Sequence, residues 1–462
     1  MDVCRRRAVG AAVVVAILAC GSGVVTSQLA EESSEMRGAR SPDLVLQWNE
    51  IAMDTQVDAG TGPVPQVRFV TITQLAVFEA VNAITGKYEP YLGTMSAPDG
   101  ASPEAAAVAA AHKVLVTYFS GKASALDLAY QTSLGTIPDG QPKSDGVAFG
   151  EAVANAMVAL RANDGSSPAK TKVPGPAVPG EYQATASCPI GPSGAKEGSF
   201  YQWKDVRPFA VAGADFVARP PPELTSRRYA RDYLEVLSVG GASSTARPQD
   251  RADVVRVYGQ AGPAVLMNSA TRQLALAARG SLTENARNLA LVNMAMSDGF
   301  LASFSNKYRY NFWRPETAIH AGDSDGNPAT PGDPSFVPFI TTPCYPDYPS
   351  NQGTLVNAAA GVLRRLYGER GHRISLSFPA VAGVTLTYSR LSQFTTDVAD
   401  ARVYGGIHFR SAQNEAERLG KKMARAVYRT VLQPVHGHHH EDSADEDEDE
   451  LLDRGGWGDG TD

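Results

Sequence analysis

Hydrophobic residues recur at helical spacing along most of this chain. Near the N-terminus, Leu44, Trp48, Ile51 and Ala52 fall on one helical face, and residues 69–84 are apolar at the same spacing. Strand-like alternation of apolar and polar residues is scarce, and no repeat of fixed period is visible. The pattern therefore predicts an all-α protein.

Helix-forming segments continue toward the C-terminal part of the sequence. Pro103 follows Ser102, a favoured pairing of an N-cap with a first helical residue. The predicted segments are 105–119, 146–160, 224–306, 351–367 and 409–432, with a less regular one at 387–398.

Residues 163–222 break this pattern. They are rich in proline and glycine, with the runs P-G-P-A-V-P-G and R-P-P-P, and apolar periodicity is lost. We expect two packed helical bundles, at 43–162 and 223–433, joined by this long excursion. Long loops without secondary structure are often functional lids, but a plain connector fits equally well.

Residues 1–27 read as an export signal. Arg5 to Arg7 form a basic start, and Ala8 to Leu18 form a short apolar stretch. Residues 28–42 look like a polar linker. The chain is thus expected to be exported, either secreted or periplasmic. Alternatively, Cys20 in the run I-L-A-C resembles a lipidation site, which would make the protein a lipoprotein held at a membrane.

The C-terminal end carries a different signal. Residues 434–462 combine H-G-H-H-H-E with a long acidic run and are predicted to be disordered. The chain of 462 residues has a formal charge of −7, and much of that acidity lies in this tail. Such a balance gives no general attraction to nucleic acid, so small molecules are the expected partners. The pattern does not indicate an oligomeric state.

Two cysteines remain once the export segment is set aside. Its removal takes Cys4 and, depending on where cleavage occurs, Cys20, which leaves Cys188 and Cys344. In an oxidising compartment a disulfide between them is permitted, and it would tie the excursion to the segment just before Ser350. Two free buried thiols are the alternative, since a sequence does not show proximity.

Three separate segments supply residues suited to a tetrahedral oxyanion. K-Y-R-Y-N-F-W-R contains Lys307 and Arg314, Y-P-S-N-Q-G contains Ser350, and A-R-V-Y-G-G-I-H-F-R contains Arg402 and His408. Arginine offers planar forked donors, lysine a point charge, serine a hydroxyl, and histidine a lone pair or a nucleophile. Ser350 also precedes a helical run, and a helix N-terminus aims free N–H groups at an anion.

These segments carry a family resemblance. The order K-x6-R, then a serine heading a helix, then R-x5-H resembles the signature of vanadium-dependent haloperoxidases and type 2 phosphatidic acid phosphatases. The similarity to bacterial vanadium haloperoxidase-like proteins extends to W-N-E-I-A-M-D near Trp48, F-E-A-V-N-A-I at 78–84 and R-N-L-A-L-V-N-M-A-M-S-D-G at 287–299, and covers roughly residues 43–430. The resemblance implies an all-α fold with vanadate as cofactor.

The resemblance also implies roles for individual residues. His408 would be the axial vanadium ligand of a haloperoxidase, or the covalent nucleophile of a phosphatase, since vanadate mimics a phosphoryl group under attack. Lys307, Arg314 and Arg402 would bind the equatorial oxygens. Ser350 would join them, with the backbone N–H of Asn351 in place of the family's usual glycine. The implied substrates are hydrogen peroxide, a halide and an organic acceptor.

One position departs from the family pattern. The middle motif normally reads S-G-H, and the histidine serves in acid–base catalysis, whereas this chain has Gln352. Glutamine exchanges hydrogen bonds but does not ionise near neutral pH, so turnover is expected to be weakened. A phosphatase using the same site, and a phosphate- or vanadate-binding protein without catalysis, are the alternatives. His320 is considered as a substitute acid.

Two aromatic residues are candidates for the lining of the same site. Phe304 lies one turn before Lys307, and Tyr345 lies in the segment that leads to Ser350. Both therefore sit next to motif positions in the chain.

Overall fold

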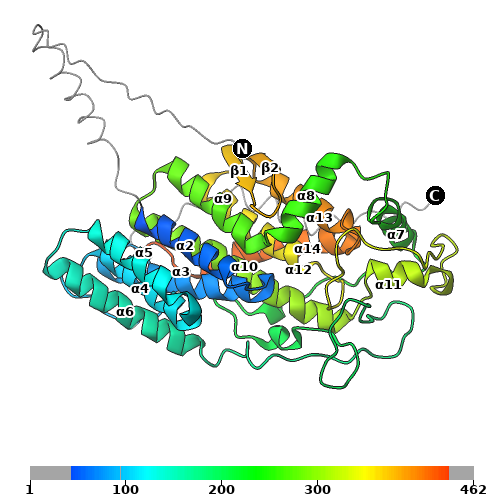
Figure 1. Ribbon diagram of the computed structural model, residues 1–462, viewed down its shortest axis with the longest axis horizontal. Helices are drawn as coiled ribbons and strands as arrows, with labels where there is room; N and C mark the ends of the chain where they lie inside the picture. Colours follow the sequence, from blue (N-terminus) through cyan, green and yellow to red (C-terminus); the bar gives the residue numbers. More distant parts are fainter. Residues whose placement is uncertain (1–42, 94, 436–462) are drawn as a thin grey trace, which may run out of the picture. The chain divides into compact units, whose positions relative to one another are not determined.

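The computed structural model describes residues 43–93 and 95–435, and this part of the chain is mostly helical (Figure 1). The prediction of an all-α fold is confirmed. The helices are α2 (Leu44–Asp58), α3 (Pro63–Thr85), α4 (Pro103–Tyr118), α5 (Ala123–Gly135), α6 (Gln141–Arg161), α7 (Arg227–Val239), α8 (Gln249–Gln260), α9 (Pro263–Ala278), α10 (Leu282–Tyr310), α11 (Pro315–His320), α12 (Asn351–Tyr367), α13 (Ser392–Val403) and α14 (Arg410–Thr430). The predicted export segment and linker, and the tail beyond residue 435, lie outside the described residues.

Serine N-caps set the starts of several of these helices. The Ser102 hydroxyl accepts a hydrogen bond from the Ala105 N–H at the head of α4, as its sequence pairing with Pro103 predicts. Ser281 and Glu284 form a reciprocal capping box at the start of α10. These local rules explain why helix starts could be placed from the sequence.

Helix α10 lies at the centre of the helical packing. It packs against α3, α9, α12 and α14, and its apolar residues belong to one hydrophobic cluster that runs from α2 to the end of α14. A row of buried amides adds specificity, because the Asn268 side chain hydrogen-bonds to both Asn49 and Asn293. Helices on both sides of the excursion therefore share this core, and the bundle boundaries at 43–162 and 223–433 stay predictions.

A second hydrophobic cluster surrounds the motif segments. Tyr229 and Tyr233 of α7 pack with Phe312, Trp313 and Phe409, all of which are buried. Phe312 and Trp313 directly precede Arg314, and Phe409 directly follows His408. Aromatic packing thus fixes the backbone on both sides of the candidate site.

The excursion contains no α-helix but is tied to the helices by buried contacts. The Asp298 carboxylate of α10 accepts hydrogen bonds from the backbone N–H groups of Phe209, Ala210 and Val211 at 2.7–2.9 Å. Burial raises the pKa of Asp298 to about 6, although these three donors oppose the shift. Asn306 of α10 also hydrogen-bonds to the backbone of Phe216 and Ala218, so the helix holds the excursion through more than one side chain.

A disulfide joins Cys188 of the excursion to Cys344. Of the two alternatives that the sequence left open, the structure contains the bridge. Its partner Cys344 lies next to Tyr345, so the bridge connects the excursion to the candidate site.

The helix predicted at 387–398 is wrong in its first half. Residues Thr385–Arg390 form strand β2, which pairs antiparallel with β1 (Arg370–Ser377), and α13 begins only at Ser392. In β1 the buried Ile374 and Leu376 alternate with exposed residues, as in a half-buried strand. The alternation is too short to stand out against the long helical patterns on either side.

One described helix, α3, is long and apolar enough to cross a membrane by length and composition, and 83% of its most apolar window is buried inside the protein.

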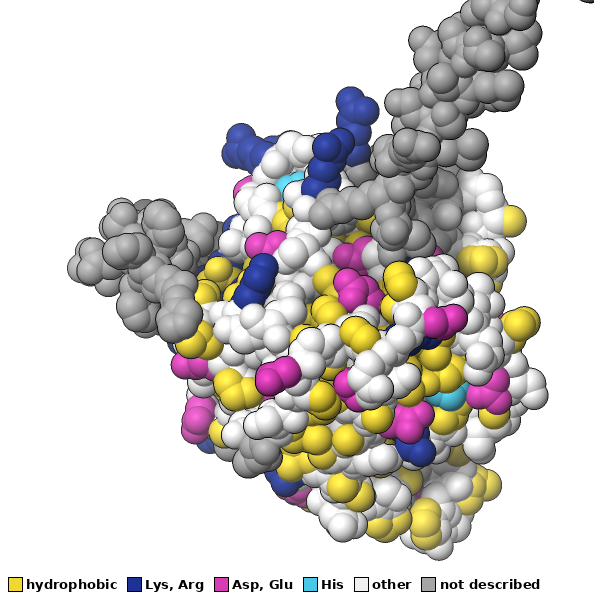
Figure 2. All heavy atoms as spheres, turned by 90° about the vertical axis from the view of Figure 1, so that its left-hand side faces the viewer, with side chains coloured by type: hydrophobic (Ala, Val, Ile, Leu, Met, Phe, Trp, Pro, Cys, Tyr) yellow, Lys and Arg dark blue, Asp and Glu magenta, His cyan; other side chains and the backbone are white. Residues whose placement is uncertain are grey.

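Figure 2 shows the end of the molecule that carries α4, α5 and α6. Basic side chains there are few and stand among acidic and hydrophobic ones, so this face offers no continuous basic surface.

Candidate active site

The structure brings the four strongest sequence candidates together. Lys307 lies in the last turn of α10, Arg314 caps the start of α11, Arg402 lies in the last turn of α13, and His408 precedes α14. Their exposed fractions are 0%, 0%, 8% and 1%. Three basic side chains are thus buried beside one histidine, which is unfavourable unless negative charge compensates them.

Lys307 is held by the backbone of the segment before α12. Its Nζ donates hydrogen bonds to the carbonyl oxygens of Pro346 at 2.9 Å and Asp347 at 2.8 Å. Burial, together with the nearby Arg314, lowers the pKa of Lys307 well below its usual range, and Asp347 opposes that shift. An anion bound here would favour the charged form of this lysine.

Arg314 links the first motif segment to the third. Its Nε donates to the Tyr345 carbonyl at 2.8 Å, and its Nη1 donates to the Ile407 carbonyl at 2.7 Å. The same Nη1 lies 3.0 Å from Nε2 of His408, while the buried Nη2 has no hydrogen-bond partner among the described residues. One nitrogen of this guanidinium is therefore a buried donor without an acceptor.

Among the three basic residues, Arg402 has the fewest hydrogen-bond partners. No hydrogen bond or ion pair of its side chain occurs within the described part of the chain, and its Nε is buried without a partner. Burial lowers its pKa to about 10, Arg314 adds to that shift, and Tyr345 opposes it. A guanidinium placed in this way lacks the acceptor that most buried charges have.

Asp347 is a site residue that the motif comparison did not identify. It is fully buried, and its Oδ1 lies 2.7 Å from Nδ1 of His408 and 3.6 Å from Nη1 of Arg314. The contact with His408 has the length of a hydrogen bond but not its alignment. Its position, three residues before Ser350 in the run Y-P-D-Y-P-S, was the signal that could have indicated it.

The electrostatics of Asp347 and His408 reflect their shared burial. Burial raises the pKa of Asp347 to about 7, although the positive charges of Arg314 and Lys307 favour its ionised form. Burial also lowers the pKa of His408 well below its usual value, and the three neighbouring cations add to that effect. The imidazole of His408 is therefore neutral and has one ring nitrogen with a lone pair.

Ser350 and Asn351 form the start of α12, as predicted. The Ser350 hydroxyl accepts a hydrogen bond from the Gly353 N–H at 3.1 Å, and its own N–H donates to the Ala412 carbonyl. The Asn351 amide lies 3.5 Å from the Tyr345 hydroxyl, a long contact. Ser350 thus caps the helix, and its neighbours connect it to the aromatic side of the site.

The Gln352 side chain points toward α8 and not toward the basic residues. Its amide Nε2 donates to the backbone carbonyl of Tyr258 in α8 at 3.0 Å, and within the described residues its side chain forms no hydrogen bond with the basic cluster. His320 does not replace it, since the His320 Nε2 is hydrogen-bonded to the Phe336 carbonyl. Neither Gln352 nor His320 therefore supplies an ionisable group in place of the missing histidine.

Tyr345 is the aromatic centre of the cluster. The Lys307 Nζ lies 5.3 Å and the Arg314 guanidinium 5.0 Å from its ring centroid, both within range of a cation–π contact. Phe304 packs on the same ring at 5.2 Å, and Phe200 of the excursion lies at 6.3 Å. Both aromatic residues considered from the sequence thus lie beside the basic cluster, and the excursion covers one side of it.

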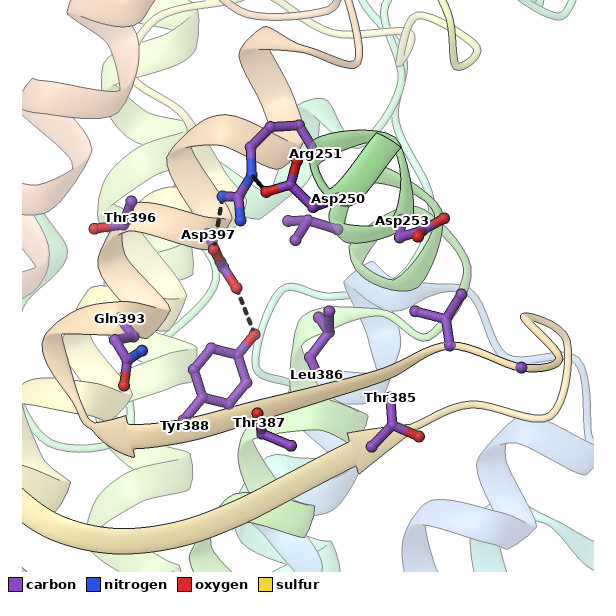
Figure 3. Close-up of a pocket in the computed structure, with 13 residues that line it drawn as sticks. Asp250, Arg251, Asp253, Thr385, Leu386, Thr387, Tyr388, Gln393, Thr396 and Asp397 are labelled. Atoms are coloured by element: carbon purple, nitrogen blue, oxygen red, sulfur yellow. Dashed lines mark hydrogen bonds and ion pairs between the residues drawn. The ribbon is translucent and has the colours of Figure 1, made fainter. Parts of the chain in front are cut away.

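A surface cavity of about 520 Å³ lies apart from this cluster, between α8, β2 and α13 (Figure 3). None of its lining residues belongs to the basic cluster. Tyr388 on its wall hydrogen-bonds to Asp397 and to the Tyr258 hydroxyl, and Asp397 also pairs with Arg251. The cavity therefore reaches Gln352 only indirectly, through Tyr258.

Comparisons with known proteins agree with the geometry. Residues 287–437 match the sequence model of the "VCPO second helical-bundle domain" family. A vanadium chloroperoxidase from Curvularia inaequalis is 28% identical over 199 residues, which cover 36% of this chain and 32% of that protein. The match thus spans about a third of the curated relative's length.

Solved structures show the same architecture. A bacterial vanadium-dependent iodoperoxidase has a TM-score of 0.70 at 22% identity and covers 86% of this chain and 98% of its own. The apo form of a bacterial vanadium-dependent chloroperoxidase has a TM-score of 0.64 at 16% identity over 79% of this chain and 93% of its own. At these identities the structures show a shared fold. Together with the sequence matches, they confirm the resemblance to vanadium haloperoxidases.

Proposed function

We propose that this vanadium haloperoxidase-like chain binds vanadate in the basic cluster and uses it to oxidise halide with hydrogen peroxide. The observation that carries the proposal is the unpaired donor set of Arg402 and Arg314, buried beside a neutral histidine. Buried donors without acceptors match an oxyanion that supplies several acceptor oxygens.

The donor set fits the charge and chemistry of vanadate. Lys307, Arg314 and Arg402 would hold its oxygens and neutralise their charge, while the His408 lone pair would bind the metal. Bound vanadate would act as a Lewis acid that activates peroxide toward attack by halide. The other residues would position it: Ser350 caps the start of α12, and the Tyr345 ring packs beside Lys307 on one side of the cluster.

We expect proton delivery to limit this reaction in the present chain. Conversion of halide and hydrogen peroxide to hypohalous acid and water consumes one proton. The family's histidine would assist that transfer, but Gln352 does not ionise and donates its amide to Tyr258. General acid–base help is typically worth roughly 10²–10⁴-fold in rate, so we expect slow turnover at an intact binding site.

The test is bromination of a dimedone reporter by the purified protein with bromide, peroxide and preloaded orthovanadate. We expect weak vanadate-dependent activity that rises by roughly 10²-fold or more in Gln352→His. Gln352→Asn is the matched control, because it keeps a non-ionising amide and should not gain activity. Silence of both the native protein and Gln352→His, despite bound vanadate, would contradict the haloperoxidase proposal.

Gln352 also supports a second candidate, an oxyanion-binding protein without turnover. Equilibrium binding of phosphate or vanadate with no bromination and no phosphate release would identify it. A phosphatase would instead hydrolyse a phosphomonoester without metal and lose that activity to added vanadate, since His408 would act as its nucleophile. For any of these activities, we propose that residues 1–27 direct the chain out of the cytoplasm.

A further inference from the structure

We propose that Asp347 is a positioning residue that holds His408 in the tautomer with its proton on Nδ1 and its lone pair on Nε2. The inference rests on the proposed function for its consequence, but its geometric basis is independent of any bound group. Contacts on both sides of the imidazole point to the same tautomer.

A hydrogen-bond donor lies against Nε2 of the His408 imidazole. Nη1 of Arg314 lies 3.0 Å from Nε2 of His408, and a guanidinium has no lone pair with which to accept a hydrogen bond. Nε2 must therefore be the acceptor. In a neutral ring, the proton is then on Nδ1.

A hydrogen-bond acceptor lies against Nδ1 of the same imidazole. Nδ1 of His408 lies 2.7 Å from Oδ1 of Asp347, the length of a charge-assisted hydrogen bond, although the two groups are not in full alignment. Both residues are buried, so water does not compete for this contact. The backbone N–H of Phe409 also acts on the Asp347 carboxylate, but among the side chains that pair with it the imidazole at 2.7 Å is nearer than Nη1 of Arg314 at 3.6 Å.

The backbone of Asp347 is itself fixed. Its N–H donates to the Phe312 carbonyl at 2.9 Å, and its carbonyl accepts from Lys307 Nζ at 2.8 Å. The carboxylate is therefore delivered to His408 by a segment anchored to both ends of the first motif. A carboxylate beside Nδ1–H orients the ring and makes Nε2 a stronger ligand or nucleophile.

The charge of Asp347 and its positioning role predict opposite effects of its replacement on vanadate affinity. Asp347 is a negative charge close to an anion site, so Asp347→Asn alone should strengthen the binding of every oxyanion. If Asp347 positions His408, the same substitution should weaken vanadate, which needs the Nε2 lone pair. Sulfate, which the cations hold without coordination by His408, should bind as well or better.

The experiment measures orthovanadate and sulfate binding to the full chain and to Asp347→Asn by equilibrium dialysis. We expect a 10- to 100-fold loss of vanadate affinity, the usual range for removing a partner behind a ligating histidine, with sulfate affinity unchanged or increased. Retained sulfate binding also shows that the variant is folded. Equal strengthening of both anions would overturn the proposal.

A second measurement does not depend on a variant or on vanadate. In the native protein labelled with ¹⁵N-histidine, the ring nitrogens of His408 should report a proton on Nδ1 and none on Nε2. A proton on Nε2 would refute the inference directly. If the tautomer is as expected but the native protein binds sulfate and not vanadate, the proposed function fails while the role of Asp347 stands.

Discussion

At the scale of single residues, the site is defined by positive charges that the protein itself compensates only in part. Lys307 and Arg314 each satisfy part of their donors with backbone carbonyls, whereas the side chain of Arg402 has no acceptor among the described residues. A buried, unpaired guanidinium destabilises the free protein. Its presence is therefore better explained by a ligand than by stability.

Replacement of Arg402 by methionine should separate these two effects. The apolar side chain removes the unpaired charge, so the free protein should be as stable as the native one or more stable in thermal unfolding. Loss of a charge-assisted donor should weaken vanadate or phosphate binding by roughly 10- to 150-fold, or about 1.5–3 kcal/mol.

Arg309→Met provides the control for that experiment. Arg309 is an exposed arginine two residues after Lys307, and its replacement should leave anion affinity unchanged. Unchanged affinity in Arg402→Met as well would remove Arg402 from the site.

At the scale of elements, the site depends on the close approach of α12 and α14. Ser350 begins α12 and His408 precedes α14, so the distance between these helices sets the distance between the second and third motifs. Small residues allow the approach. A Cβ placed on Gly420 would lie 2.6 Å from the Thr354 carbonyl oxygen, which is a backbone atom that cannot move aside.

Gly420→Ala should therefore force α14 away from α12. We expect a lower unfolding temperature, from an overpacking penalty of about 1–3 kcal/mol, together with weaker anion binding. Gly135→Ala is the matched control, because that helical glycine faces open space and should tolerate alanine without loss. A Gly420→Ala protein as stable as the native chain would show that the helices can separate without cost.

At the scale of the whole described chain, the excursion is part of the site's enclosure. Phe200 packs near Tyr345, and Cys188 is bonded to Cys344, although about 156 residues separate the two cysteines in sequence. A bridge that closes so long a loop constrains the unfolded chain strongly. The excursion thus contacts the residues that surround the basic cluster, and its role as a lid or as a plain connector stays a prediction.

Reduction of the disulfide should destabilise the protein by roughly 2–5 kcal/mol and weaken anion binding. Thermal unfolding with and without a thiol reductant measures the first effect. The double variant Cys188→Ser/Cys344→Ser should show the lower stability without reductant and no further change with it. If the reductant still lowers the unfolding temperature of the double variant, its effect on the native protein does not come from this disulfide.

The sequence by itself determined what depends on neighbours in the chain. Helical periodicity and N-caps such as Ser102 and Ser350 are local, so helix positions and the all-α class followed from them. The motif spacing likewise indicated Lys307, Arg314 and His408. The hairpin at β1 and β2 was missed, because a strand is stabilised by a partner elsewhere and its short alternation is a weak signal.

Only the tertiary structure decided which groups meet. It placed the Asp347 carboxylate against His408, directed Gln352 toward Tyr258, left Arg402 unpaired and joined Cys188 to Cys344. Burial and contact between distant segments arise from packing, and they set both the pKa values and the unsatisfied donors. The spacing of residues in the sequence indicates which of them are available to a site. Their chemistry depends on the groups that the fold buries beside them.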